Sequence, residues 1–265
     1  MVRRIGATSL AFLAAFSLVN LASAARPPRP AAKKPASGVK VSSEADPNAL
    51  IAVATPALAQ AAAEFKTQTK ALVVAESGNG APAYAAQDLG KVVASAEAAV
   101  QKALSEPELA PLRDRSALAF RRARAALGSG GGPVAKDTAD SALSALGQFL
   151  DRLATLGSKE PATVDLCVVS KPDPGSRASF RPVSDPAAVK VLTTDFPITL
   201  VRGLYSYSAA PPEGSKGKPI QCGWENAGGA GAAAAPCLDL FDDPKAGLVC
   251  DFAHGTCQRG AASCS

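Results

Sequence analysis

The sequence has few of the side chains on which enzymes rely most. It holds one histidine, one methionine and one tryptophan in 265 residues, and aromatic residues make up 5%. A Ser–His–Asp or Cys–His catalyst would have to use His254 as its base, and no G-x-S-x-G turn accompanies it. Di-iron and haem sites lack their Glu-x-x-His, histidine and methionine ligands. The composition therefore favours a protein that is not an enzyme and holds no cofactor.

Long apolar runs are absent after Leu21, so we expect no membrane span in the mature chain. The earlier run, Ile5 to Leu21, follows Arg3 and Arg4 and ends at Ala22-Ser23-Ala24, an A-x-A cleavage site. This order predicts a signal peptide over residues 1–24 and a secreted or periplasmic protein. Retention of the run as an uncleaved anchor is the open alternative.

Cysteine is absent from the first half of the chain, and no C-x-x-C motif supports a thioredoxin-like role. The second half holds six cysteines, which in an oxidising compartment predict three disulfides with 15 alternative pairings. They are Cys167, Cys222, Cys237, Cys250, Cys257 and Cys264. Cys250, His254 and Cys257 also have a spacing open to zinc, but behind a signal peptide oxidation competes with metal binding. We therefore expect no metal.

Net positive charge is concentrated in one short segment. Residues 25–46 form a Pro/Ala/Lys-rich linker that cannot bury a core, and its first part carries basic residues without an acid. A solvated spacer is the favoured interpretation, over contact with an anionic surface or a nucleic acid. We expect no nucleic-acid partner.

Residues 47–160 have the apolar spacing of helices. Apolar and small side chains recur at steps of three and four over residues 58–72, 89–103, 109–127 and 139–153. The first helix is expected to open at Thr55-Pro56, and Gly- and Pro-containing stretches separate the four. This pattern predicts an alanine-rich antiparallel helical bundle, typical of a spacer or interaction scaffold.

Residues 161–265 change to short β-type runs between turns. Strands are predicted over residues 164–170, 177–182, 189–194, 198–208, 219–222, 237–241 and 247–252. "KPDPGS" (171–176) predicts a turn, with Gly175 supplying the permissive backbone. The chain is thus predicted to be α+β and multi-domain, with the bundle followed by a small disulfide-stapled β-sandwich-like module.

The stretches "LCVVSKPDPGSRASFRP" and "TTDFPITLVRGLYSYSA" resemble the PEGA-type β modules of extracytoplasmic proteins. The resemblance lies in an S-x-P-x-G-A-like turn after the first strand and a later G-x-Y strand, and it covers roughly residues 164–210. The sequence departs from the pattern at Ser176, where alanine is usual, and it lacks the glycine of the second turn between Arg177 and Thr193. The resemblance implies a small β accessory module outside the cytoplasm, and it supplies no catalytic residues.

Three groups of residues are candidates for chemistry or binding. His254 is interpreted as a surface histidine in a disulfide loop. A loose acidic cluster, open to Ca²⁺ or to a glycosidase pair but favoured as a solvated turn, consists of Asp239, Asp242, Asp243 and Asp251. An aromatic platform for a glycan or peptide, with core packing as the favoured alternative, consists of Trp224, Tyr205 and Tyr207.

Together these features predict an exported, non-enzymatic envelope or secreted protein. The helical part would act as a spacer, and the stapled β module would bind an envelope protein or a glycan. Two alternatives remain open, a secreted hydrolase or glycosidase that uses the acidic cluster or His254, and a secreted inhibitor or adhesin. The oligomeric state is not predicted.

Overall fold

The computed structural model describes residues 45–265 apart from residues 79, 129–131, 173, 186, 223–236, 242–246, 261, 263 and 265. The predicted signal peptide and almost all of the basic linker lie outside these residues. The described residues belong to one compact unit. Four helices precede a strand-rich region, which confirms the predicted α+β class.

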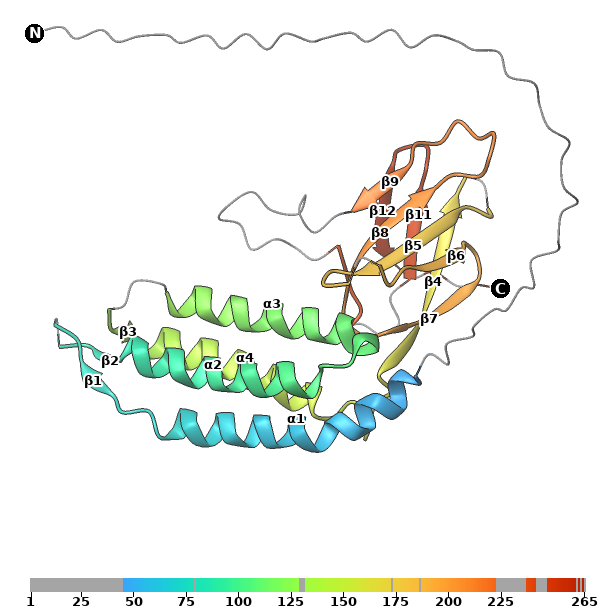
Figure 1. Ribbon diagram of the computed structural model, residues 1–265. Helices are drawn as coiled ribbons and strands as arrows, with labels where there is room; N and C mark the ends of the chain where they lie inside the picture. The colour runs from blue at the N-terminus through green and yellow to red at the C-terminus, as the bar shows by residue number, and fades with distance from the viewer. Residues whose placement is uncertain are drawn as a thin grey trace, which may run out of the picture. The chain divides into compact units, whose positions relative to one another are not determined.

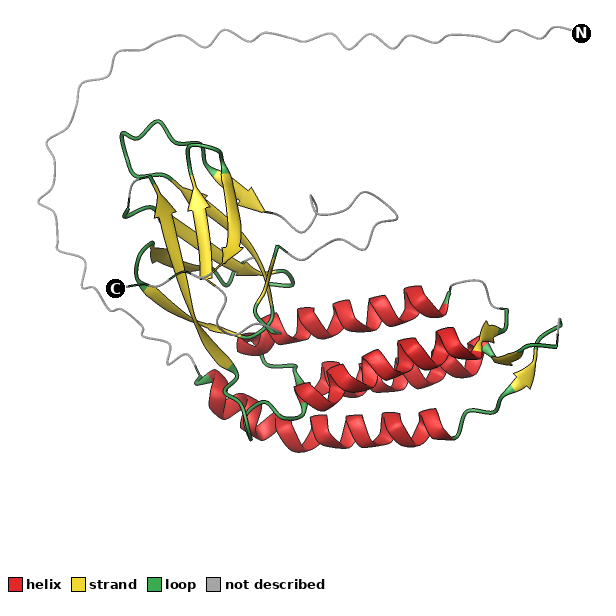
Figure 2. Cartoon of the chain, turned by 180° about the vertical axis from the view of Figure 1, so that it is seen from behind, coloured by secondary structure: helices red, strands yellow, loops and turns green. Residues whose placement is uncertain are grey.

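The four helices pack side by side as an antiparallel bundle (Figures 1 and 2). They are α1 (Pro47–Lys70), α2 (Ala86–Ala103), α3 (Ala110–Leu127) and α4 (Lys136–Leu153), with the 3₁₀ turn η1 (Pro107–Leu109) leading into α3. Each helix contacts the next along the chain, and α4 returns to contact α1. Their buried faces carry mainly leucine, valine and alanine, as the predicted spacing requires. None of the described helices is long and apolar enough to cross a membrane.

Helix α1 begins earlier than the sequence predicted. Asp46 accepts a hydrogen bond from the amide of Asn48 at 3.0 Å and forms the N-cap, so Pro56 lies inside the helix. Ile51 is fully buried, which means that the first turns belong to the bundle core. The hydroxyl of Thr55 donates to the carbonyls of Ile51 and Leu156, each at 2.7 Å. Core packing here outweighs the cost of an internal proline.

A small three-stranded sheet, labelled β1, β2 and β3 in Figure 1, lies at one end of the helical bundle. Its strands are β1 (Ala75–Glu76), β2 (Pro82–Tyr84) and β3 (Val134–Ala135). The buried Tyr84 donates a hydrogen bond to Asp140 of α4 at 3.1 Å. The sequence did not predict this sheet, because strands of two or three residues are too short to show alternation.

The strand-rich region forms two sheets that share one apolar core. Its strands are β4 (Thr163–Lys171), β5 (Arg177–Pro182), β6 (Lys190–Thr193), β7 (Pro197–Val201), β8 (Leu204–Ala210), β9 (Ile220–Cys222), β10 (Leu238–Asp239), β11 (Gly247–Asp251) and β12 (Thr256–Gly260). The strand order is β10-β8-β5-β6 in one sheet, with β9 also paired to β8, and β12-β11-β4-β7 in the other. This is the predicted sandwich-like module.

The strand predicted over residues 198–208 is divided into β7 and β8. Gly203 lies between them at φ +144°, and a Cβ at this position would lie 2.1 Å from the carbonyl oxygen of Pro111. A glycine is therefore required where the chain crosses from one sheet to the other against the start of α3. The last hairpin strand, β12, was not predicted, because four of its five residues are exposed and it shows no apolar alternation.

The bundle and the β module also share buried contacts. Phe241 is 1% exposed and belongs to the core of the bundle, with its ring 5.0 Å from that of Phe149 on α4. Arg115 of α3 forms an ion pair with Asp239 of β10 at 2.7 Å, and both side chains are about nine-tenths buried. The guanidinium of Arg115 also lies over the two phenylalanine rings.

Candidate binding surface

Three disulfides staple the β module, as the cysteine count predicted. The pairs are Cys167–Cys264, Cys222–Cys237 and Cys250–Cys257. The first ties β4 to the C-terminal end of the chain, the second joins β9 to the residue before β10, and the third crosses the hairpin of β11 and β12. They indicate a protein of an oxidising compartment. Because Cys250 and Cys257 are bonded to each other, neither offers a thiolate to zinc.

His254 lies at the exposed tip of this last hairpin. Its Nδ1 is 2.7 Å from a carboxylate oxygen of Asp251, whose other oxygen accepts hydrogen bonds from the amides of Ala253 and His254. The hydrogen bond from the His254 side chain is the main cause that holds the pKa of Asp251 below its ordinary value. The arrangement orients an imidazole, as the base of a catalytic pair would be oriented, and it also closes the turn.

The predicted acidic cluster is divided among different partners. Asp239 pairs with Arg115 inside the molecule, and Asp251 pairs with His254 at the surface. Asp242 and Asp243 lie outside the described residues. Across the part of the chain that the structure describes, no three histidine, cysteine, aspartate or glutamate side chains are grouped to hold a metal ion.

The tyrosines of the predicted aromatic platform point into the module. Tyr205 is 3% and Tyr207 is 8% exposed, and the hydroxyl of Tyr205 donates to the carbonyl of Val201 at 2.8 Å. Burial raises the pKa of both phenols. The structure thus packs both rings in the core of the module, and Tyr205 also lines a hollow near the start of α1. Trp224 lies outside the described residues.

The inward tyrosines leave the outer face of β8 to small polar residues. Strand alternation turns Ser206 and Ser208 outward, and the pairing register sets Ser208 beside Ser179 of β5 and Gln221 of β9. Val191 of β6 continues this row on the other side of Ser179 and is 59% exposed. The result is a partly exposed row of hydroxyl and amide groups across β9, β8 and β5, which ends at the apolar side chain of Val191 on β6.

Two arginines flank this row. Arg177 and Arg181 both belong to β5, point to the same side as Ser179, and are exposed. In the described part of the chain neither guanidinium pairs with a carboxylate. Strands β5, β6, β8 and β9 contain no aspartate or glutamate. We call the outward residues of these strands the polar sheet face; they are Arg177, Ser179, Arg181, Val191, Thr193, Ser206, Ser208, Ala210 and Gln221.

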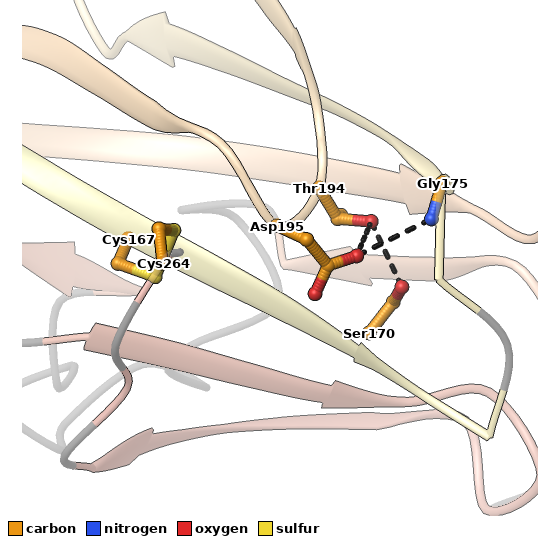
Figure 3. Close-up of a disulfide and its surroundings, with 6 residues drawn as sticks. All are labelled: Cys167, Ser170, Gly175, Thr194, Asp195 and Cys264. Atoms are coloured by element: carbon orange, nitrogen blue, oxygen red, sulfur yellow. Dashed lines mark hydrogen bonds between the residues drawn. A yellow bond between two sulfur atoms is a disulfide. The ribbon is translucent and has the colours of Figure 1, made fainter.

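A hydrogen-bond network fixes the end of the sheet at which Arg177 lies (Figure 3). The carboxylate of Asp195 accepts from the hydroxyl of Thr194 at 3.1 Å and from the amide of Gly175 at 3.3 Å. Buried Ser170 and Thr194 share a further hydrogen bond of 2.8 Å. The network joins the end of β4 to the turn before β5 and to the turn after β6. It therefore holds in place the turn from which Arg177 enters β5, and Gly175 at φ +84° permits that turn as predicted.

Several hollows lie elsewhere on the compact unit. A groove of about 630 Å³ runs between α3 and α4 and is lined largely by alanines, with Arg122 and Phe149 among its other residues. A smaller hollow of about 340 Å³ lies where the first residues of α1 approach β6 and β7, with Asp46, Glu108 and Lys190 on its walls. The groove offers a mostly apolar wall, and the hollow brings charges of both signs together.

Sequence reasoning missed the polar sheet face, although part of its signal is visible in "RASFR" (177–181). The R-x-S-x-R spacing puts both arginines and the serine on one side of a strand. The serines of β8 were recognised as one face, but only the pairing register shows that they adjoin those of β5.

No protein-family model, no curated protein and no solved structure matches the chain. The resemblance to PEGA-type modules over residues 164–210 therefore stays a prediction.

Proposed function

We propose that the mature protein is an exported, secreted or periplasmic binding protein without catalytic activity. The helical bundle is its scaffold, and the stapled β module presents a binding surface to a protein or glycan of the cell envelope. The observation that carries this proposal is the polar sheet face, which is partly exposed, continuous over four strands and free of acidic residues.

The construction of the module supports the same function. A binding face gains affinity when its side chains are held in place before the ligand arrives. Here the backbone under the face is paired on both sides at β5 and at β8, and disulfides hold the neighbouring β9 and β4. The face is thus mounted on the ordered part of the module rather than on a loop.

The competing proposal of a hydrolase would have to use the Asp251–His254 pair. A general base must lie within hydrogen-bond reach of the nucleophile that it activates. The structure gives His254 its orienting carboxylate, but the hydrogen bonds recorded for its side chain in the described residues do not include a serine, threonine or cysteine. The pair accounts for a closed turn without a catalytic role.

A single bulky substitution on the face tests the proposal. Ser208→Trp would cover the centre of the row, while tryptophan suits a strand and leaves the core unchanged. Thr256→Trp, on exposed β12 of the other sheet, is the matched control. We expect Ser208→Trp to weaken capture of purified envelope glycans or envelope proteins by about tenfold or more, a loss of about 1.4 kcal/mol, and Thr256→Trp to leave it unchanged.

Equal capture by the two variants would contradict the proposed surface. An ester or glycoside turnover that the unaltered protein shows and His254→Ala abolishes would contradict the absence of catalysis. Circular dichroism of each variant checks that the fold is kept, so that lost capture is not lost structure.

A further inference from the structure

We infer that the ligand of the polar sheet face is an anionic polysaccharide. Its acidic groups would pair with Arg177 and Arg181, and its hydroxyl groups would form hydrogen bonds with the side chains between them. The inference rests on the proposed function, because it names the ligand class of the same surface.

The charge of the face selects an anionic partner. The β module holds four arginines. Among the described residues, the guanidinium groups of Arg177 and Arg181 have no hydrogen-bond or ion-pair partner. Arg202 instead pairs with Glu160 at 3.0 Å, and Arg259 donates to the carbonyl of Asp239 at 2.7 Å. A carboxylate, sulfate or phosphate on the ligand would give Arg177 and Arg181 the charge-assisted hydrogen bonds that the protein does not.

The spacing of the face suits a linear polymer with repeated acidic groups. Arg177 and Arg181 are four residues apart on one strand, which separates their Cα atoms by about 13 Å. Ser179 lies between them, with Ser208 and Gln221 beside it on the next strands. A chain lying along β5 would meet charge, hydroxyl and charge in that order, with further hydroxyl and amide groups at its flank.

The same face is poorly suited to an extended peptide. A peptide that adds to a sheet needs a strand with unpaired backbone groups. Strand β5 is paired with β6 and β8 on its two sides, and β8 is paired with β5 and with β9 and β10. An edge of this sheet lies at β6, which is only four residues long. A ligand lying over β5 and β8 must therefore be held by side chains, and serine hydroxyls and the Gln221 amide both donate to and accept from sugar hydroxyls.

Single-stranded nucleic acid is disfavoured by the absence of stacking groups on the described face. Proteins that bind single strands combine basic side chains with aromatic rings on which bases stack. In β8 both tyrosines turn into the core, and the outward residues of the four strands include no aromatic ring. An anionic sugar polymer needs the charge and the hydroxyls without the rings.

The test compares two double variants of the full mature chain with the same loss of charge. Arg177→Gln/Arg181→Gln removes both charges of the face, and Arg121→Gln/Arg122→Gln removes two from the exposed side of α3. Both keep a long polar side chain at each position. The probes are polygalacturonate and dextran sulfate, with dextran as the neutral polymer, and affinity is measured by biolayer interferometry at several salt concentrations.

We expect the unaltered protein to bind one or both anionic polymers, to bind dextran weakly, and to lose affinity as salt is added. The face variant should bind about tenfold more weakly than the α3 variant, because two exposed ion pairs together contribute on this scale. A preference between the two polymers identifies the carboxylate or the sulfate as the favoured group.

Three results would overturn the inference. The first is an equal loss of affinity in the two double variants. The second is binding of dextran as tight as that of the anionic polymers. The third is a loss of binding in Lys33→Gln/Lys34→Gln, in the basic linker, while the face variant still binds. If Ser208→Trp still abolishes capture of an envelope ligand, the proposed function stands and only the ligand class is wrong. If Ser208→Trp has no effect on any ligand, the proposed function itself fails.

Discussion

Replacing Phe241 by alanine tests whether the helical bundle and the β module unfold as one unit. The ring comes from the segment after β10, is 1% exposed, and packs in the bundle core 5.0 Å from Phe149. Arg115 and Arg152 both lie over it. Truncating a buried phenylalanine to alanine costs about 3–5 kcal/mol, because the removed ring loses its transfer free energy and leaves a cavity.

This cost predicts a large shift in thermal stability. For a chain of roughly this size, 1 kcal/mol corresponds to about 2–4 °C in Tm, so Phe241→Ala should lower Tm by about 6–20 °C. Phe196→Ala is the control, since Phe196 is 63% exposed, and its effect should stay within about 0.5 kcal/mol.

The assay is thermal unfolding followed at 222 nm, with hydrogen exchange measured in peptides from α4 and from β4. If the two parts are coupled, Phe241→Ala speeds exchange in both sets of peptides. The reasoning fails if Phe241→Ala melts at the same temperature as Phe196→Ala. It also fails if exchange rises in β4 while α4 keeps its full protection.

Two further predictions concern single positions. Gly203→Ala should lower Tm and the yield of folded protein, because a Cβ would lie 2.1 Å from the carbonyl oxygen of Pro111; an unchanged melting curve would refute the close approach. His254→Ala should raise the pKa of Asp251, seen by NMR titration of its carboxyl carbon, since the His254 side chain is the main cause of the lowered value. A depressed pKa stabilises the fold above the ordinary aspartate pKa of about 3.9 and loses this effect as pH falls through the folded value, so the variant should lose it at a higher pH. An unmoved titration would show that the backbone amides alone set this pKa.

The helical half was predictable to a large extent because its signal is local and repeated. Alternating steps of three and four, interrupted by glycine and proline, identified all four helices. What failed was the start of α1, where burial of Ile51 and a cap at Asp46 overrode the expected opening at Thr55-Pro56. The contact of Phe241 with the bundle had no local signal, since it joins residues nearly a hundred positions apart.

The candidate site was predictable only in parts. The number of disulfides followed from an even cysteine count in a chain predicted to be exported, but their pairing depends on which strands become neighbours. Cys167 and Cys264 meet across 97 positions of sequence. The alternation in β8 was visible, yet which of its faces is buried is decided by the opposite sheet. That choice turned Tyr205 and Tyr207 inward and left the serines outside.

Chemical footprinting of arginine tests the central claim most directly. Phenylglyoxal modifies accessible guanidinium groups, and peptide mass spectrometry measures the extent at each position with and without bound anionic polysaccharide. The account predicts that the polymer protects Arg177 and Arg181 and leaves Arg121 and Arg122 as reactive as before. Protection confined to Arg26 and Arg29 of the linker, or no difference at Arg177 and Arg181, would contradict it.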